Sequence, residues 1–171
     1  MGGQADLAQI TVVQAQAADL VSVMEILDEA AAWLAAHGIR QWPSPHPPHV
    51  WQRTAAAVQR GEVYLAYPIR DRAPVGTARM TWTDAYWAHD LTPAGYIHGL
   101  AIRTRLHGQH LGEQLLSWAK DHVRRTDRTF LRLDCLTQNA ALCHYYETRG
   151  FRFCGKIEDQ DYRANLYEQA V

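Results

Sequence analysis

The segment from Tyr96 to Phe151 decides the fold, and it reads YIHGLAIRTRLHGQHLGEQLLSWAKDHVRRTDRTFLRLDCLTQNAALCHYYETRGF. Apolar residues first run together, then recur at helical spacing, and the same two patterns follow a second time. The pattern predicts an apolar strand, a turn with two glycines, an amphipathic helix, a second apolar strand and a helix with two adjacent tyrosines. These five parts lie at 96–102, 107–112, 108–124, 130–136 and 139–149.

The turn from His107 to Gly112 joins a strand to the start of a helix, and such a turn makes an anion site. Its backbone N–H groups and the positive end of the helix both point at the bound group. Tyr145 and Tyr146 follow on the last helix, where a phenol could give a proton to a leaving group. The residues therefore favour a transferase that holds a phosphate-bearing acyl carrier and protonates the carrier as it leaves.

The composition narrows the classes of protein and of binding partner that fit this chain. A chain of 171 residues suits one domain, residues 1–171, with a core of its own. The net charge of −1 gives no sign of a nucleic-acid or membrane partner. The start of the chain lacks the basic and apolar regions of a signal peptide, so a cytoplasmic location is expected. The three cysteines are expected to be reduced thiols, and no metal is expected because the nine histidines are scattered.

The other elements follow from periodicity and turn residues. Four prolines between 43 and 48 predict a loop over 41–49, because proline lacks the backbone donor that a helix needs. Aromatic and acidic residues at 83–94 suggest a surface loop that covers a pocket. The order β-α-α-β-β-β-α-β-α-β-β predicts an α/β fold with a central mixed sheet and helices on both faces. Strands are expected at 9–14, 63–67, 75–82, 96–102, 130–136, 151–157 and 162–167, and helices at 20–37, 50–59, 108–124 and 139–149.

On these residues the chain resembles the GNAT superfamily of acyl-CoA N-acyltransferases, over nearly its whole length. The strand segment Leu-Ala-Ile-Arg at 100–103 is common in that family before its Q/R-x-x-G-x-G/A turn. The turn of this chain departs from the pattern. His107 stands in the Gln/Arg slot and His110 in the slot of the middle glycine, while Gly112 keeps its place. The resemblance implies a mostly antiparallel sheet flanked by about four helices.

The last helix matches the family's N-x-x-A-x-x-Y/F-Y-x-x-x-G-F pattern at Asn139, Tyr146, Gly150 and Phe151, with Leu142 in the alanine slot. The resemblance implies that a primary amine attacks the thioester of acetyl-CoA directly. Backbone N–H groups would bind the acyl oxygen, the pantetheine arm and the pyrophosphate. The implied cofactor-binding residues are Leu100, Ala101, Ile102, Arg103, His107, Gly108, Gln109, His110, Leu111, Gly112, Asn139 and Tyr146.

Two residues are assigned to proton transfer. Tyr146 matches the family's register for the general acid that protonates the departing thiolate, and Tyr145 is expected to pack or to line the pocket. His98 is the candidate base, because histidine titrates near neutrality and Gly99 occupies the slot where the family often has a glutamate. A buried structural histidine is an equal alternative at His98. The other candidate bases are Glu25, Asp28, Asp84 and Asp134.

The acceptor site is assigned to Glu25, Trp42, Trp87 and Asp134. Aromatic walls suit a small amine with an apolar or planar part, and they stabilise ammonium groups by cation–π contact. The alternative is that the tryptophans are core residues and the acids a solvated helix face. A homodimer is expected to use the hairpin at 151–167, since dimers are common in the superfamily.

Three other functions remain open at this stage. The two histidines in the turn, His107 and His110, leave room for an acyl donor other than acetyl-CoA. A protein or peptide acceptor differs from a small amine only in how open the pocket is. A non-catalytic CoA-binding module is the third, and the presence of Tyr146 and Asn139 argues against it.

Overall fold

The structure is a computed structural model, and it describes residues 9–159 and 162–171. Within these residues seven strands form one sheet in the order β1-β2-β3-β4-β5-β7-β6. The strands are β1 (Ile10–Gln14), β2 (Val63–Pro68), β3 (Gly76–Thr81), β4 (Ala94–Ile102), β5 (Phe130–Leu136), β6 (Arg152–Asp159) and β7 (Tyr162–Ala170). The helices are α1 (Leu20–Ala36), α2 (Pro48–Gln59), α3 (Leu111–Arg124) and α4 (Ala140–Glu147), with short 3-10 turns at Ala17–Asp19, Ala85–Trp87 and Thr104–Leu106.

The predicted order of elements and the predicted fold class are confirmed. Every sheet pairing is antiparallel except that of β4 with β5. Several boundaries differ by two or three residues: α3 begins at Leu111 and not at 108, and β7 continues to Ala170. The α2 helix begins at Pro48, inside the segment that was expected to be a loop. Proline is tolerated in the first helical turn, where its missing N–H would have no partner within the helix.

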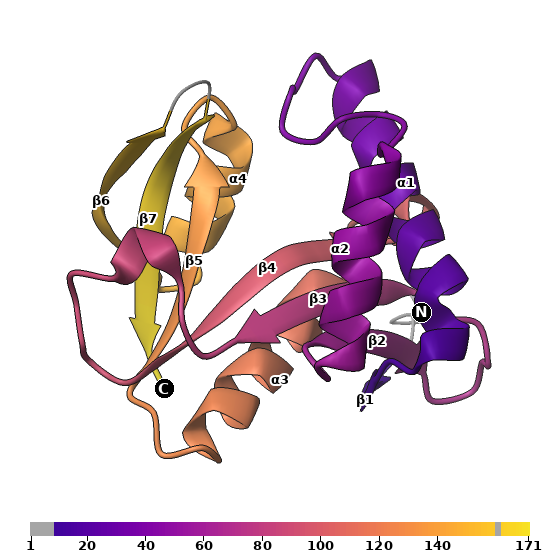
Figure 1. Ribbon diagram of the computed structural model, residues 1–171, viewed down its shortest axis with the longest axis horizontal. Coiled ribbons are helices and arrows are strands. Elements are labelled where there is room, and N and C mark those ends of the chain that lie inside the picture. Colours follow the sequence, from indigo (N-terminus) through magenta and orange to yellow (C-terminus); the bar gives the residue numbers. More distant parts are fainter. Residues whose placement is uncertain (1–8, 160–161) are drawn as a thin grey trace, which may run out of the picture.

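The helices cover both faces of the sheet (Figure 1). On one face, Val23 and Ile26 of α1 pack with Ala57 and Val58 of α2 against β2. On the other face, α3 buries an apolar stripe against the centre of the sheet. That stripe consists of Leu111, Leu115, Leu116, Ala119 and Val123. Residues three and four apart share one helix face, so the helical spacing in the sequence places these side chains correctly.

The sheet splits between β4 and β5. These strands pair only from Ala94 to Tyr96, opposite Phe130 to Arg132. Beyond Tyr96 the two strands diverge, as Figure 1 shows. No strand among the described residues covers the facing edge of β4 there, so backbone groups on that edge are available to a ligand.

A bulge marks β4 at the same place. Thr77 lies opposite Ala101, but Arg79 lies opposite His98, so β4 carries one more residue than β3 between these pairs. Gly99 absorbs the irregularity with a φ of 55°, a value that glycine adopts without strain. Bulges bend a strand and re-aim its side chains. The bulge therefore sets the direction of His98, one of the predicted catalytic residues.

None of the helices within the described residues is long and apolar enough to cross a membrane. The start of the chain, where no signal peptide is expected, lies outside the described residues.

Candidate active site

A cavity of about 650 Å³ fills the split between β4 and β5. Its walls come from four parts of the chain: β4, β5, the turn before α3, and the tyrosine helix α4. The end of α1 and the loop after it close one side. Its lining includes Ala30, Trp33, Leu34, Gln41, Trp42, residues 97–102, Leu106, His107, Gly108, residues 110–113, Leu133, Asp134, Asn139, Leu142, Tyr145, Tyr146, Arg149 and Tyr162.

The turn keeps the backbone shape of a glycine turn although a histidine stands in it. His110 directly precedes α3 and has φ 59° and ψ 15°, in the left-handed region. Its imidazole Nδ1 lies 2.8 Å from Glu113 Oε1, and more than half of the side chain is exposed. The side chain is therefore held toward solvent by Glu113, and the first turn of α3, at Leu111 and Gly112, lines the cavity.

Gly112 lies close to its neighbour on α4. A Cβ atom at this position would lie 3.0 Å from the hydroxyl oxygen of Tyr145, a tight contact that the tyrosine would have to relieve by a small shift. The Arg149 guanidinium lies 3.6 Å from the centre of the Tyr145 ring and also pairs with Glu113. These contacts fix α4 against the start of α3, and they place one cation, Arg149, beside the turn.

Tyr146 lies in the wall of the cavity and is only 7% exposed. Asn139 caps its helix, because the Asn139 side-chain oxygen accepts a hydrogen bond from Leu142 N–H at 3.2 Å. Burial raises the pKa of the Tyr146 hydroxyl, so the phenol is protonated at neutral pH. Its hydroxyl has no hydrogen-bond partner within the part of the chain that the structure describes. A protonated, unpartnered phenol at the cavity wall is suited to donate a proton.

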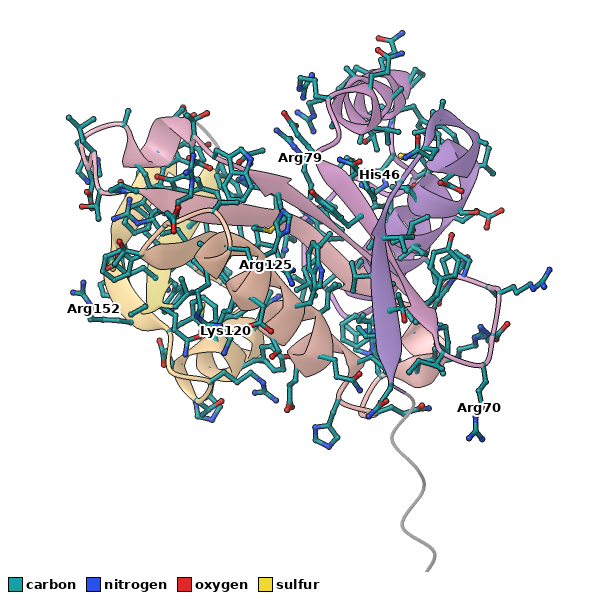
Figure 2. All side chains as sticks on the ribbon, turned by 90° about the horizontal axis from the view of Figure 1, so that it is seen from below. His46, Arg70, Arg79, Lys120, Arg125 and Arg152 are labelled. Carbon is teal, nitrogen blue, oxygen red and sulfur yellow. The ribbon has the colours of Figure 1, made fainter. Side chains whose placement is uncertain are left out.

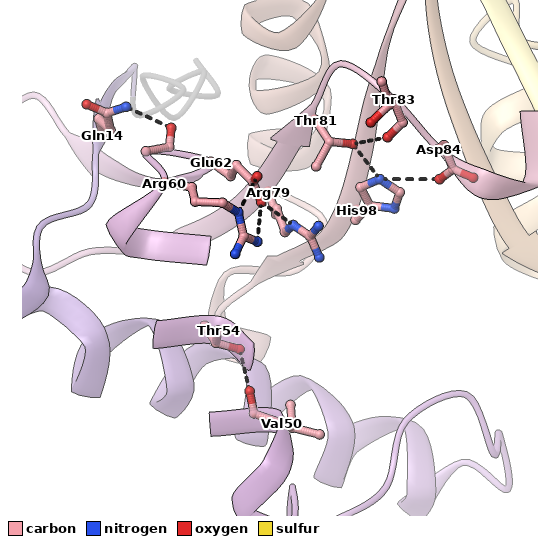
Figure 3. Close-up of polar contacts among 11 residues, drawn as sticks. Gln14, Val50, Thr54, Arg60, Glu62, Arg79, Thr81, Thr83, Asp84 and His98 are labelled. Atoms are coloured by element: carbon pink, nitrogen blue, oxygen red, sulfur yellow. Dashed lines mark hydrogen bonds and ion pairs between the residues drawn. The ribbon is translucent and has the colours of Figure 1, made fainter. Parts of the chain in front are cut away.

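His98 is held by two contacts on one ring nitrogen. Its Nε2 lies 3.0 Å from Thr81 Oγ1 and 3.5 Å from Asp84 Oδ2 (Figure 3). The Thr81 hydroxyl also lies 3.1 Å from the carbonyl oxygen of Thr83, to which it can donate. With its proton on Nε2 the imidazole can donate to Thr81 Oγ1 and faces the Asp84 carboxylate, while the Thr81 hydroxyl donates to Thr83; this tautomer leaves Nδ1 as an acceptor.

The electrostatics of His98 favour the neutral imidazole. Burial lowers the pKa of His98, and the carboxylates of Asp84 and then Asp134 partly oppose that effect. A neutral imidazole with a free lone pair can accept a proton at neutral pH. The geometry thus resembles the base-and-orienting-group pair that nucleophilic enzymes use.

Asp84, His98 and Asp134 form the cluster best suited to a metal among the described residues. One ligand atom from each lies within 4.8 Å of the others. Two carboxylates and an imidazole suit a divalent cation. The same side chains already have protein partners, since Asp134 also accepts a hydrogen bond from the Tyr162 hydroxyl. The prediction that no metal binds stays a prediction.

A second cavity of about 320 Å³ lies between the sheet and helices α1 and α2. Trp42, His98 and Gly99 line both cavities, so the two spaces meet at the bulge of β4. The side chain of His46 also lines the second cavity, and its Nδ1 lies 2.6 Å from Asp28 Oδ1. A carrier in the first cavity and an acceptor in the second would therefore meet beside His98.

The sequence of the chain matches the model of the Acetyltransferase (GNAT) family over residues 25–151. The chain belongs to the GNAT family. It is therefore an acyltransferase.

Individual proteins agree with the family assignment. The chain is 28% identical over 141 residues to the uncharacterized N-acetyltransferase YesJ of Bacillus subtilis (strain 168), an alignment that covers 80% of this chain and 78% of YesJ. A GNAT acetyltransferase of Listeria monocytogenes superposes with a TM-score of 0.76 at 22% identity, covering 95% of each chain. The aminoglycoside acetyltransferase AAC(6')-Ib, in complex with coenzyme A and kanamycin, gives a TM-score of 0.74 at 21% identity, also over 95% of each chain. At such identities the two structures establish the fold.

Most of the predicted carrier-binding residues line the first cavity. Two do not. Gln109 lines neither cavity. Arg103 also lines neither, because its guanidinium turns to α1 and pairs with Glu29 at 2.9 Å and Glu25 at 3.3 Å. The ones that line it are Leu100, Ala101, Ile102, His107, Gly108, His110, Leu111, Gly112, Asn139 and Tyr146.

Two of the four predicted acceptor residues lie elsewhere. Glu25 lines neither cavity and is paired with Arg103. Trp87 is 4% exposed, and its ring lies 4.1 Å from the Arg132 guanidinium, within the core beneath the 83–94 loop. It is a core residue. Trp42 and Asp134 do line the first cavity.

The sequence analysis missed several cavity residues. Arg149 and Tyr162 belong to the first cavity, and Arg53 and Arg79 to the second. For Arg79, the alternation of side chains along the strand expected at 75–82 was a usable signal, because every second residue of a strand points to the same face. No local pattern marked Tyr162, which reaches the cavity only through the pairing of β7 with β5.

Proposed function

We propose that this GNAT enzyme transfers an acetyl group from acetyl-CoA to a primary amine of a small molecule. The observation that carries the proposal is the cavity in the split sheet, which ends at a left-handed turn at the N-terminus of α3 and has Tyr146 in its wall. The coenzyme A bound to the aminoglycoside acetyltransferase of the same fold supports the choice of carrier.

The carrier is placed by matching its chemistry to the walls. The pyrophosphate lies at the turn, where the N–H groups of residues 110–112 and the helix dipole favour an anion. Arg149 supplies a positive charge beside that turn. The pantetheine arm lies along the open edge of β4, and the N–H groups at 100–102 bind its amides and the acyl oxygen.

Catalysis then follows from two proton transfers. An alkylamine is mostly protonated at neutral pH, and only its neutral form attacks the thioester carbon. His98 Nδ1 takes the amine proton, directly or through one water, while Asp84 and Thr81 hold the ring. The C–N bond forms, the C–S bond breaks, and the thiolate of CoA takes the proton of the Tyr146 hydroxyl. After the C–N bond forms, the nitrogen loses its second proton, which passes through water to the Tyr146 phenolate. The proton held by His98 is released to solvent as the products leave, so both side chains return to their starting states.

A small acceptor is favoured over a protein. The second cavity is bounded by α1, α2 and the segment around Trp42 and His46, and its volume of about 320 Å³ is that of a compact molecule.

The three cysteines are free thiols, including Cys135 and Cys143 with sulfur atoms 3.6 Å apart, and a reducing compartment such as the cytoplasm suits them.

The proposal is tested by titration calorimetry with acetyl-CoA and CoA, followed by turnover with a panel of small amines. CoA release is followed with a thiol reagent, the acetylated amine by mass spectrometry, and thioester hydrolysis by a reaction without amine. Binding of the carrier with an N-acetylated product is expected. Binding without any product would support a carrier-binding module instead. Absence of binding would point to another acyl donor.

A further inference from the structure

Cationic side chains line the second cavity. Arg53 of α2 and Arg79 of β3 both line it, and no aspartate or glutamate of the described residues does so. The remaining lining is largely apolar and includes Leu27, Trp42 and Val50. A site of this composition suits an anionic group attached to an apolar body.

The terminal nitrogens of the Arg79 guanidinium are available to donate hydrogen bonds to a ligand. Its Nε donates to Glu62 at 3.1 Å, but Glu62 also accepts two hydrogen bonds from Arg60, at 2.7 and 2.9 Å. One carboxylate therefore serves two guanidinium groups. Within the part of the chain described, the terminal nitrogens of Arg79 have no protein partner. Arg53 likewise has no ion-pair partner among the described residues.

Arg79 also lies beside the predicted base. It is directly opposite His98 across β3 and β4, where side chains of neighbouring strands share one face. Figure 3 shows the Arg79 guanidinium and the His98 ring on neighbouring strands, with Thr54 and Val50 on α2, and all four residues line the second cavity. Figure 2 places Arg79 and His46 at the same region of the molecule. An amine near His98 would thus have a cation within reach of its other end.

We propose that the acceptor amine carries a carboxylate or phosphonate that Arg79 and Arg53 bind, next to an apolar body that packs on Trp42 and Val50. An amino acid with an apolar side chain is the simplest member of this class. The inference rests on the proposed function, since it names the substrate class of the same site. It gives the binding role to two arginines, whereas the sequence-based assignment gave the acceptor site the acidic residues Glu25 and Asp134.

Three carboxylates of α1, those of Glu25, Asp28 and Glu29, already have partners within the protein. Glu25 and Glu29 pair with Arg103, and Glu29 also accepts from both the backbone N–H and the hydroxyl of Thr104. Asp28 accepts from His46. A second cationic group on the acceptor would therefore meet Arg53 and Arg79 without a free carboxylate to offset the repulsion.

The experiment compares matched pairs that differ only in the anionic group. N-acetyl-L-leucine and N-acetyl-L-phenylalanine are titrated into the CoA-bound protein, beside the N-acetyl derivatives of 3-methylbutylamine and phenethylamine and the phosphonate analogue of leucine. The parent amines are run in the turnover assay in parallel. We expect the anionic member of each pair to bind about tenfold more tightly or better, as for one charge-assisted hydrogen-bond pair.

Variants assign the preference to the arginines. Arg79→Gln should abolish most of the preference, and Arg53→Gln should reduce it. Glu62 keeps Arg60 as a partner in Arg79→Gln, so the fold is preserved. Arg60→Gln is the matched control, because it removes a guanidinium from the same carboxylate but outside the cavity, and the preference should remain.

Equal or tighter binding of the neutral members, or a preference that survives Arg79→Gln, would overturn the inference. Failure of every anionic compound to bind would overturn it as well. The binding and turnover readouts separate the two proposals. Anionic compounds that bind but are never acetylated would support the anion site while the proposed reaction fails. Turnover restricted to neutral or cationic amines would support the reaction and reject the anion site.

Discussion

Removal of one oxygen from Tyr146 isolates the proposed acid step. Tyr146→Phe keeps the ring and its contacts with Tyr145 and Phe151, whose ring centres lie 5.5 and 5.6 Å away. The lost hydroxyl has no hydrogen-bond partner within the described residues, so no group is left unsatisfied. The free energy of unfolding should therefore change by less than about 0.5 kcal/mol or rise slightly, because a buried polar group is removed.

The catalytic effect should be much larger than the structural one. A positioned general acid contributes roughly 100- to 10,000-fold to a rate. At about 1.4 kcal/mol for each factor of ten, this is about 3–5 kcal/mol of transition-state stabilisation. Water at the same place is the substitute donor in the variant. We thus expect kcat to fall by about 100-fold or more, with an unchanged dissociation constant for acetyl-CoA.

The assay is single-turnover acetyl transfer with thiol detection, combined with titration of acetyl-CoA and urea unfolding of both proteins. Tyr145→Phe is the matched control, since it removes the same oxygen from the adjacent residue, whose ring stays stacked on Arg149. That control should keep kcat within about twofold, because the Tyr145 hydroxyl lies against the turn at Gly112 and takes no part in the proposed proton transfers. A Tyr146→Phe rate within about threefold of the native rate would refute the assignment. A joint loss of rate and carrier binding would indicate a structural role.

Three further changes test other parts of the site. Asp84→Asn removes a charge that raises the pKa of His98, so the acid limb of the kcat/KM profile should move to lower pH while the plateau falls; an unchanged profile would exclude His98 as the base. Trp87→Ala should lower the free energy of unfolding by about 3–5 kcal/mol in urea titrations without changing KM for the acceptor, whereas the opposite pattern would return Trp87 to the acceptor site. His110→Gly should leave acetyl-CoA affinity intact and shift the unfolding free energy by less than about 1 kcal/mol, because relief of left-handed strain offsets the added chain entropy. His110→Val should lower both the affinity for acetyl-CoA, measured by calorimetry, and the stability of the fold, measured by thermal melting. An unchanged affinity in the valine variant would mean that the turn does not hold the pyrophosphate.

The sequence predicts those structural features that are determined by residues close together along the chain. Helical spacing identifies the buried residues of α3 from Leu111 to Ala119, and the register of the last helix places Asn139 at its cap. The left-handed position in the turn was also foreseeable, because the family pattern has a glycine where His110 stands. In each case the physical cause acts within a few residues.

Contacts between distant segments were not predictable in the same way. Arg103 lies next to the turn in sequence, but it pairs with Glu29, 74 positions earlier, since α1 crosses behind it. Trp87 sits in a segment with the composition of a surface loop, yet the buried cation of Arg132, 45 residues later, draws its ring into the core. His98 was a candidate, but its orientation depends on Asp84 and on the bulge at Gly99.

The narrow junction of the sheet has a thermodynamic consequence. Within the described residues, β4 and β5 pair only at 94–96 and 130–132, and the Thr129 N–H adds one backbone hydrogen bond to the Pro93 carbonyl. A carrier lying in the split would add non-covalent links across the same boundary, and ligands that bind only the folded state stabilise it by mass action. Amide hydrogens of β5 and β7 should then exchange more slowly with solvent as the carrier concentration rises. The frequency of local opening in this half of the molecule would thus depend on how much acyl carrier is present.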